Sequence, residues 1–367
     1  MRPGDGGGIL RAQTVPLFTH DVMATHSPGP IPITHEPPNA ETPLAELRHR
    51  VTPADVFYVR SHFPVPAIDP ATWSVRLGGA VRRPLRLSLP EVAALPSRTV
   101  RVTLECAGNG RKGMRPTPPG TPWGLGAAGT AEFTGTPLRA LLEDAGVMEG
   151  AAEVLFRGAD HGADGTRCYE RSLPLESALD PDTLLCWEMN GQPLAPLHGA
   201  PLRLVVPGWY AMASVKWLAE IEVLTEPFRG FYQRRDYVYL DEEGTPQATP
   251  VTRMRVRSLI LHPPPEAVLG PDVVEVAGVA WSGSGPIAAV EVSTDGGMEW
   301  RPARVEEPGD PFAAQRWWFA WRPAAPGEYT LLARATDVAA RRQPLRAPWN
   351  RLGYGNNACQ AVTVSVR

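Results

Sequence analysis

The chain has 367 residues, 43% of them hydrophobic, which is enough for two domains and a sizeable core. Its 35 Gly and 41 Pro together make about 21% of the residues, below the ~25–30% typical of low-complexity chains. The formal net charge of −3 gives no basic footprint for nucleic acid or an anionic membrane, and no apolar run reaches the ~18 residues of a membrane span.

Residues 1–40 are rich in Gly and Pro and predict an extended arm. This stretch has no continuous apolar region of a secretory signal and no twin-arginine motif. We therefore expect a cytoplasmic location, or a periplasmic one if an export signal has been removed.

Residues 41–250 mix short strands with few helices and predict an α+β domain. A short helix is expected to open at Pro43 with Thr42 as its cap, and a longer one at Pro137 with Thr136 as its cap and Gly146 as its stop. The alternating segments predict strands at 73–89 (paired around Gly78-Gly79), 100–104, 154–156, 183–185 and 202–206.

From residue 251 to 367 the pattern changes to short alternating strands at the spacing of a β-sandwich. Asp295-Gly296-Gly297 predicts a hairpin turn between two of them. The expected organisation is thus an arm at 1–40, a mixed domain at 41–250 and an all-β domain at 251–367.

The four cysteines, Cys106, Cys168, Cys186 and Cys359, are widely spaced and form no C-x-x-C pair. This spacing argues against a disulfide framework, a zinc site, a haem attachment motif and an iron–sulfur cluster. Most such cysteines are inert core residues, but Cys106 follows a strand, enters a Gly-rich loop and precedes Arg111 and Lys112. Because nearby cations lower the pKa of a thiol, Cys106 is a candidate metal ligand or nucleophile.

The text Leu104-Glu105-Cys106-Ala107-Gly108-Asn109-Gly110-Arg111 resembles the molybdenum-cofactor site of the sulfite oxidase family, whose usual signature is C-A-G-N-R-R. Four further segments resemble that family in the same order, at 57–66, 187–203, 215–218 and 234–237. The resemblance runs from about residue 45 to the end. It implies a mixed α/β molybdopterin-binding catalytic domain followed by an immunoglobulin-like dimerisation domain.

The resemblance also implies one molybdenum–molybdopterin cofactor per chain, with the Cys106 thiolate as the only protein ligand to the metal, a role that suits a soft donor. The residues that match the family's cofactor-binding positions are Arg60, His62, Cys106, Asp160, His198, Arg203 and Lys216. Arg203 and Lys216 have the chemistry to meet a phosphate. Taken alone, His62 and His198 also fit core histidines, and Asp160 fits an ordinary turn residue.

On the substrate side, the resemblance implies an oxyanion pocket formed by Arg60, Arg111, Trp123 and Tyr237, with Arg60, Cys106, Arg111 and Tyr237 as catalytic residues. A rim tyrosine and a packed core tryptophan are the ordinary alternatives for Tyr237 and Trp123. Gly110 departs from the signature by replacing the first of its two arginines. In Trp349-Asn350-Arg351-Leu352-Gly353 the family's arginine is displaced by one residue, so we expect Arg351 to point away from the pocket.

The activity that the resemblance implies is oxidation of sulfite to sulfate by oxygen-atom transfer, with electrons passed to a separate acceptor such as a cytochrome. A homodimer is implied, with no haem, no iron–sulfur cluster, no nucleic acid and no membrane as partners. Two alternatives remain open at this point. One is a reductase of sulfoxide or nitrate on the same scaffold, and the other is a non-catalytic β-sandwich assembly module.

Overall fold

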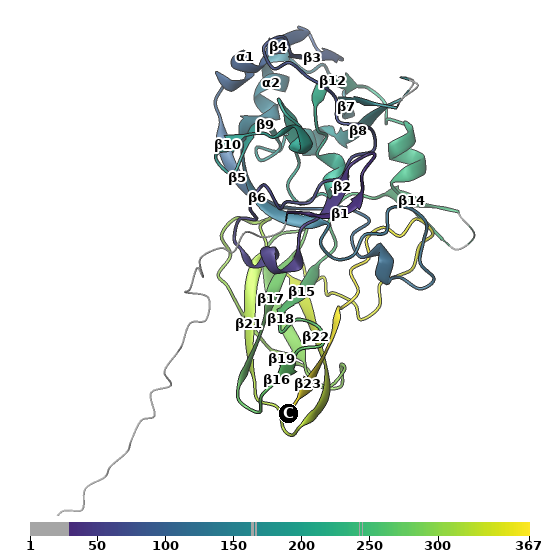
Figure 1. Ribbon diagram of the computed structural model, residues 1–367. Coiled ribbons are helices and arrows are strands. Elements are labelled where there is room, and N and C mark those ends of the chain that lie inside the picture. Colours follow the sequence, from purple (N-terminus) through teal and green to yellow (C-terminus); the bar gives the residue numbers. More distant parts are fainter. Residues whose placement is uncertain (1–28, 163–164, 166, 242, 244) are drawn as a thin grey trace, which may run out of the picture.

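The computed structural model describes residues 29–367 apart from 163, 164, 166, 242 and 244 (Figure 1). The first 28 residues of the predicted arm lie outside the described residues. The remainder of that arm forms β1 (Ile31–Thr34) and β2 (Asn39–Glu41), which pair antiparallel. Among the described helices, none is long and apolar enough to cross a membrane.

Two five-stranded sheets build the part of the chain that precedes residue 225. The first has the order β10-β9-β6-β5, with β11 also paired to β9. Its strands are β5 (Arg98–Glu105), β6 (Ala128–Pro137), β9 (Leu184–Met189), β10 (Gln192–Pro193) and β11 (Arg203–Val205). The second has the order β4-β3-β12-β7-β8. Its strands are β3 (Ser74–Gly79), β4 (Leu85–Ser88), β7 (Glu153–His161), β8 (Cys168–Pro174) and β12 (Leu218–Leu224). Every strand predicted from the alternating segments of this region is confirmed.

The helices are few and short, so the fold is mostly β. They are α1 (Leu89–Ala93), α2 (Leu138–Ala145) and α3 (Leu175–Ala178), with 3₁₀ turns η1 (Leu44–Arg48), η2 (Arg111–Gly113), η3 (Pro196–His198) and η4 (Ala211–Ala213), and a π-helical turn η5 (Tyr232–Asp236). Gly146 ends α2 in the left-handed region, as predicted.

Both predicted threonine caps are wrong. The Thr42 hydroxyl donates to the Ala128 carbonyl, and the Thr136 hydroxyl donates to the Val92 carbonyl. Each helix instead begins after a proline, Pro43 or Pro137, without a side-chain cap. The tertiary contact is preferred because both hydroxyls are buried, where an unpaired polar group is costly.

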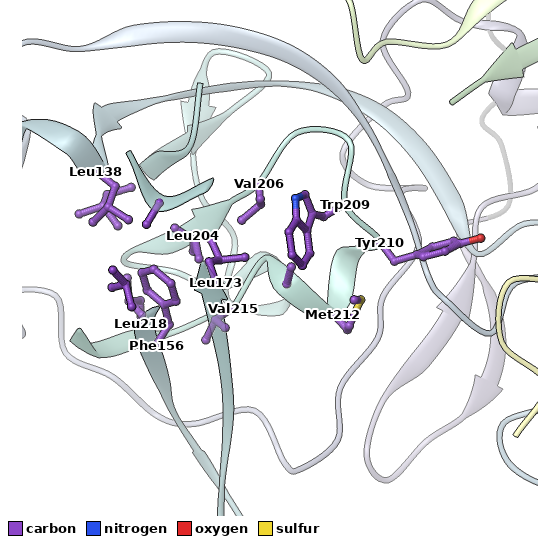
Figure 2. Close-up of a cluster of buried hydrophobic side chains, with 14 of the residues drawn as sticks. Leu138, Phe156, Leu173, Leu204, Val206, Trp209, Tyr210, Met212, Val215 and Leu218 are labelled. Carbon is purple, nitrogen blue, oxygen red and sulfur yellow. The ribbon is translucent and has the colours of Figure 1, made fainter. Parts of the chain in front are cut away.

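The main hydrophobic core fills the space between the two sheets (Figure 2). Leu138 from α2 packs there with residues of β7, β8, β11 and β12, among them Phe156, Leu173, Leu204 and Leu218. All of these side chains are fully buried. This packing holds the two sheets in a fixed relative position, and residues at the ends of their strands form the site described below.

The rest of the chain forms two further sheets that face each other as a sandwich. One has the order β15-β17-β21-β20, from β15 (Arg257–His262), β17 (Val274–Trp281), β20 (Arg304–Val305) and β21 (Gln315–Trp321). The other has the order β16-β23-β22-β18-β19, from β16 (Val268–Leu269), β18 (Ile287–Ser293), β19 (Arg301–Pro302), β22 (Gly327–Asp337) and β23 (Ala361–Val366). Strands β13 (Val238–Leu240) and β14 (Pro246–Pro250) connect the two parts of the chain.

Asp295-Gly296-Gly297 lies in the predicted turn, between β18 and β19, with both glycines at positive φ.

The segment between β22 and β23 leaves the sandwich and returns to the first part of the molecule (Figure 1, yellow). There the Gly355 N–H donates to the Ala107 carbonyl at 2.8 Å, and the Trp349 indole donates to the Pro116 carbonyl at 2.8 Å. This return brings residues from the end of the chain beside the loop that follows Cys106.

Candidate active site

Cys106 lies where two pockets meet. Its N–H donates to the Ala127 carbonyl at 2.9 Å, so the pairing of β5 with β6 continues up to the cysteine. The chain then turns, with the Asn109 N–H donating to the Cys106 carbonyl and Gly110 at a φ of 84°. The side chains of Arg60, Cys106 and Tyr237 line both pockets.

The first pocket has an empty volume of about 670 Å³. It collects the residues predicted to bind a cofactor, which the sequence spreads over more than 150 positions: Arg60, His62, Cys106, Asp160, His198, Arg203 and Lys216. Several of its walls were not predicted, namely those formed by Tyr58, Ser61, Tyr169, Met212 and Ser214. Tyr58 and Ser61 lie within the family-like segment 57–66, whereas Tyr169, Met212 and Ser214 stand in no motif that marks a binding residue.

Two cations of this pocket are held by neutral oxygens alone. The Arg203 guanidinium donates to the carbonyls of His198 at 3.0 Å and Ser214 at 3.3 Å. Lys216 Nζ donates to the Leu197 carbonyl at 2.9 Å and to Ser61 Oγ at 3.2 Å. Among the described residues, no carboxylate forms an ion pair with either cation. Burial lowers the pKa of both groups, so both are poised to gain from an anionic ligand.

Asp160 presents an unsatisfied acceptor to the same pocket. The residue is 3% exposed, and its Oδ1 has no hydrogen-bond partner. Burial raises the pKa of this carboxyl group to about 6, against the opposing charge of Lys216. A buried, unpaired oxygen of this kind fits a ligand that offers N–H donors.

Both histidines are neutral. Burial lowers the pKa of His198 to about 4, and its Nε2 donates to the Ala54 carbonyl at 3.0 Å. Burial, with help from Arg60, also lowers the pKa of His62 well below its usual value. The His62 ring stacks on Tyr169 at 4.5 Å, and its Nε2 shares a hydrogen bond of 2.8 Å with Tyr237 Oη. His62 therefore bridges the predicted cofactor residues and the predicted substrate residues.

The second pocket, with an empty volume of about 660 Å³, collects the predicted substrate residues Arg60, Arg111, Trp123 and Tyr237. Arg111 is 5% exposed, and it donates to the carbonyls of Leu352 at 3.1 Å and Thr121 at 2.9 Å. No described carboxylate pairs with it, so its charge is available to the pocket. A Cβ added at Gly108, Gly120 or Gly353 would lie within 3 Å of its side chain, so the three glycines form a close-fitting cradle.

Arg351 does not reach this pocket. Its side chain is exposed, and the neighbouring wall is formed by Leu352 and Tyr354. The exposure of Arg351 agrees with the expectation, but its reason differs: residues 350–353 form a turn and not an extended segment. Asp236 and Tyr354, which were not predicted, also line the pocket and are joined by a hydrogen bond of 2.9 Å from Tyr354 Oη.

The expectation of a low pKa at the Cys106 thiol is wrong. Burial raises its pKa, and this effect outweighs Arg60, the Gly108 N–H and Arg111, all of which lower it. Lys112 is exposed, and its charge acts on Glu41 instead. The thiol is therefore protonated in the protein alone, and a metal ion is needed to displace the proton.

Two family models match the two parts of the chain. Residues 62–232 match the family model of the oxidoreductase molybdopterin binding domain, and residues 248–367 match that of the Mo-co oxidoreductase dimerisation domain. The chain is 37% identical to mitochondrial sulfite oxidase of Mus musculus over 91% of its own length and 65% of that protein. It is 36% identical to sulfite oxidase of Gallus gallus over 89% of its length and 75% of that protein.

More distant relatives differ in their named activity. Nitrate reductase [NADH] of Solanum lycopersicum is 32% identical over 90% of this chain and 40% of that protein. Among solved structures, the sulfane dehydrogenase SoxCD from Paracoccus pantotrophus superposes with a TM-score of 0.80 and 28% identity, covering 97% of this chain and 92% of that one.

Proposed function

The chain belongs to the sulfite oxidase family of molybdenum-cofactor oxidoreductases, and from this premise we propose that it oxidises sulfite to sulfate. The observation that carries the proposal is the position of Cys106 at the junction of two pockets, one lined by Arg203 and Lys216 and the other by Arg60 and Arg111. The chain spans 65% of the length of the mammalian relatives, so its activity, substrate and partners are proposed for this chain and not transferred from them.

The residues present fit a molybdenum–pterin group. No three His, Cys, Asp or Glu side chains gather as a metal site in the described part of the chain, so a metal at Cys106 takes its other ligands from outside the protein. A dithiolene is a soft ligand of the same kind as the Cys106 thiolate. The unpaired Asp160 Oδ1 suits the N–H groups of a pterin ring, and Arg203 with Lys216 suits its phosphate.

We assign the chain's residues to two tasks. His62, Asp160, His198, Arg203 and Lys216 bind and orient the pterin, while Cys106 supplies the single protein bond to the metal. Arg60 and Arg111 bind the oxygens of sulfite, and the Tyr237 hydroxyl donates a hydrogen bond to one of them. The low pKa of His62 keeps its ring neutral, so the ring holds the Tyr237 hydroxyl without adding a competing charge.

When bound, the cofactor supplies the oxygen atom that is transferred and accepts two electrons. The balance is sulfite plus water giving sulfate, two protons and two electrons, and the electrons leave one at a time to a separate acceptor. Arg60 and Arg111 contribute by holding the anion in the pocket beside Cys106. Arg111 is buried and Arg60 is half-buried, so water screens the attraction of Arg111 for the anion less than that of Arg60.

A reductase acting on nitrate is the second candidate, since nitrate reductases are among the relatives at 32% and 33% identity. One sample of known molybdenum and pterin content is offered sulfite with ferricyanide, and separately nitrate or a sulfoxide with a reduced viologen dye. We expect turnover with sulfite to dominate. Turnover confined to the viologen assays supports the reductase instead.

Replacing Cys106 tests the central assignment. Cys106→Ser exchanges a soft thiolate for a hydroxyl that binds molybdenum poorly, so sulfite turnover is expected to fall to background. Cys359→Ser is the matched control, because Cys359 is a thiol just before β23 that lines neither pocket. Sulfite oxidation that persists in Cys106→Ser contradicts the proposal.

A further inference from the structure

The side chain before the metal-binding cysteine faces the C-terminal sandwich. Glu105 is the last residue of β5, and its side chain is fully buried. Because successive residues of an extended chain point to opposite sides, Glu105 faces away from the pockets when Cys106 faces into them. Its carboxylate meets Arg257 from β15, with 2.8 Å between Nε and Oε1 and side-chain exposures of 2% and 0%.

Two more donors complete the surroundings of this carboxylate. The Trp281 indole, from β17, donates to Glu105 Oε2 at 2.9 Å. Asn109, in the turn that follows Cys106, donates to Oε1 at 3.0 Å. Arg257 also donates to the Asn109 carbonyl at 3.3 Å, so the ion pair contacts both ends of the turn.

The return segment holds the same loop at two further points. Asn356 Nδ2 donates to the Gly110 carbonyl at 2.7 Å, and the Gly355 N–H donates to the Ala107 carbonyl at 2.8 Å. A Cβ at Gly110 would lie 3.1 Å from Asn356 Nδ2, and this residue has a φ of 84°. Position 110 departs from the family signature, and a glycine there leaves room for the close approach of the return segment.

We propose that Arg257 and Trp281 of the C-terminal sandwich, together with Asn356 of the return segment, are positioning residues for Cys106. They contact the loop 105–111 on the side away from the pockets. These contacts keep the distance between Cys106 and Arg111 fixed. The sandwich in this proposal is part of the active-site scaffold in addition to any role in assembly. The inference rests on the proposed function only in that Cys106 is the metal ligand.

Two variants of the full chain test the proposal without leaving a buried charge unpaired. Asn356→Ala removes one hydrogen bond to the loop. The double variant Glu105→Gln/Arg257→Met removes the ion pair and keeps one carbonyl oxygen, which accepts from Trp281 or from Asn109 but not from both. A single Arg257→Met variant is avoided because it strands the Glu105 carboxylate in the core. The control is Glu291→Gln/Arg334→Met, which removes an ion pair of 2.9 Å within the sandwich, between β18 and β22.

The readout is the alkylation rate of individual cysteines in cofactor-free protein at fixed pH, followed by peptide mass spectrometry. Cys186 serves as an internal reference for global opening, because it is 0% exposed and lies in β9 of the same domain. We expect Asn356→Ala to raise the ratio of Cys106 to Cys186 alkylation about fivefold, the change that follows from loss of one hydrogen bond. The double variant is expected to change the ratio in the same direction, and the control is expected to leave it unchanged.

A second readout concerns the loaded enzyme. If the loop sets the geometry at the metal, the Mo(V) electron paramagnetic resonance spectrum of Asn356→Ala shifts, while that of the control matches the parent. An unchanged ratio in both test variants overturns the proposal. A parallel rise of Cys106 and Cys186 also overturns it, because it shows a general loss of stability. Since alkylation needs neither metal nor substrate, these results are independent of whether the chain oxidises sulfite.

Discussion

Lys216 and Lys112 are the only lysines among 36 basic residues, and their surroundings differ sharply. Lys216 lies in the first pocket, where its stem packs against Gly199 and its Nζ contacts two oxygens within 3.2 Å. Lys112 is exposed. A compositional preference for arginine explains the shortage of lysine, and of the two lysines only Lys216 has contacts that a compact ammonium group fits.

Exchange of each lysine for arginine tests this difference. Lys216→Arg places a longer, planar group in the confined pocket, so we expect about tenfold weaker retention of the cofactor, as for other residues that support a metal site. Molybdenum per chain, measured after gel filtration, reports the effect. Lys112→Arg is the control and is expected to retain the parent's metal content. Equal retention in the two variants contradicts the assignment of Lys216.

The buried carboxyl group of Asp160 makes the stability of the cofactor-free protein depend on pH. The pKa of its carboxyl group is about 6 in the folded protein and 3.8 in the unfolded chain, because burial disfavours the charged form. The contribution of this group to stability is therefore complete below about pH 4 and is lost as the pH rises through 6, a change of roughly 3 kcal/mol.

Asp160→Asn removes the cost of the buried charge. We expect the variant to unfold at a higher temperature than the parent at pH 8, with a gain that shrinks toward pH 5. Thermal unfolding of cofactor-free protein across this range measures it. Asp272→Asn, at an exposed position, should show no such trend. A gain for Asp160→Asn that is independent of pH would contradict the burial argument.

At the scale of elements, local signals located the strands and the two predicted helix starts well, but assigned the helix caps wrongly. The alternation in 73–89 and 100–104 matched β3, β4 and β5, because a strand with one buried face must alternate. The caps at Thr42 and Thr136 were wrong, because each hydroxyl found a carbonyl from a distant part of the chain. A propensity for capping records local partners only, and tertiary partners overrode it.

The glycine cradle of Arg111 is an element-scale feature with a measurable consequence. A Cβ at Gly353 would lie 2.8 Å from Arg111 Cγ, and Gly353 has a φ of 67°. Gly353→Ala is therefore expected to displace the guanidinium and to raise the KM for sulfite about tenfold, which corresponds to ~1.4 kcal/mol of lost binding.

Gly150→Ala separates this displacement from backbone strain. Gly150 also has a positive φ, 84°, but a Cβ there meets no atom within 4 Å. Both variants should lose ~1 kcal/mol or more of stability from the left-handed conformation. The two losses are compared by thermal unfolding, and the KM by steady-state kinetics. If Gly150→Ala raises the KM as much as Gly353→Ala, the cradle does not position Arg111.

At the scale of the whole molecule, the match of residues 248–367 to a dimerisation domain leads us to propose a homodimer with two-fold symmetry. Sedimentation velocity at micromolar concentration is expected to give about twice the 39.8 kDa of the chain. The same run with the Glu291→Gln/Arg334→Met variant shows whether the β18–β22 face takes part. A single species with the mass of one chain contradicts the dimer.

The sequence by itself determined the parts of this protein that depend on neighbours along the chain. The alternation of strands indicated a sandwich after residue 251, and the motif around Cys106 identified the thiol that lies between the pockets. The displacement of Arg351 by one position predicted that its side chain leaves the pocket, and the side chain is exposed. The segment is a turn, closed by the bond from the Gly353 N–H to the Asn350 carbonyl, so the alternation of an extended chain is not the reason.

Only the tertiary structure decided how these parts act on one another. The pKa of Cys106 rises because burial outweighs Arg60 and Arg111, and the depth of burial cannot be read from adjacent residues. The bond between Asn356 and Gly110 joins positions 246 residues apart. Desolvation and long-range packing are properties of the folded molecule. The effect of burial on the Cys106 pKa, and the contacts of the C-terminal part of the chain with the loop around Cys106, therefore could not be predicted from the sequence.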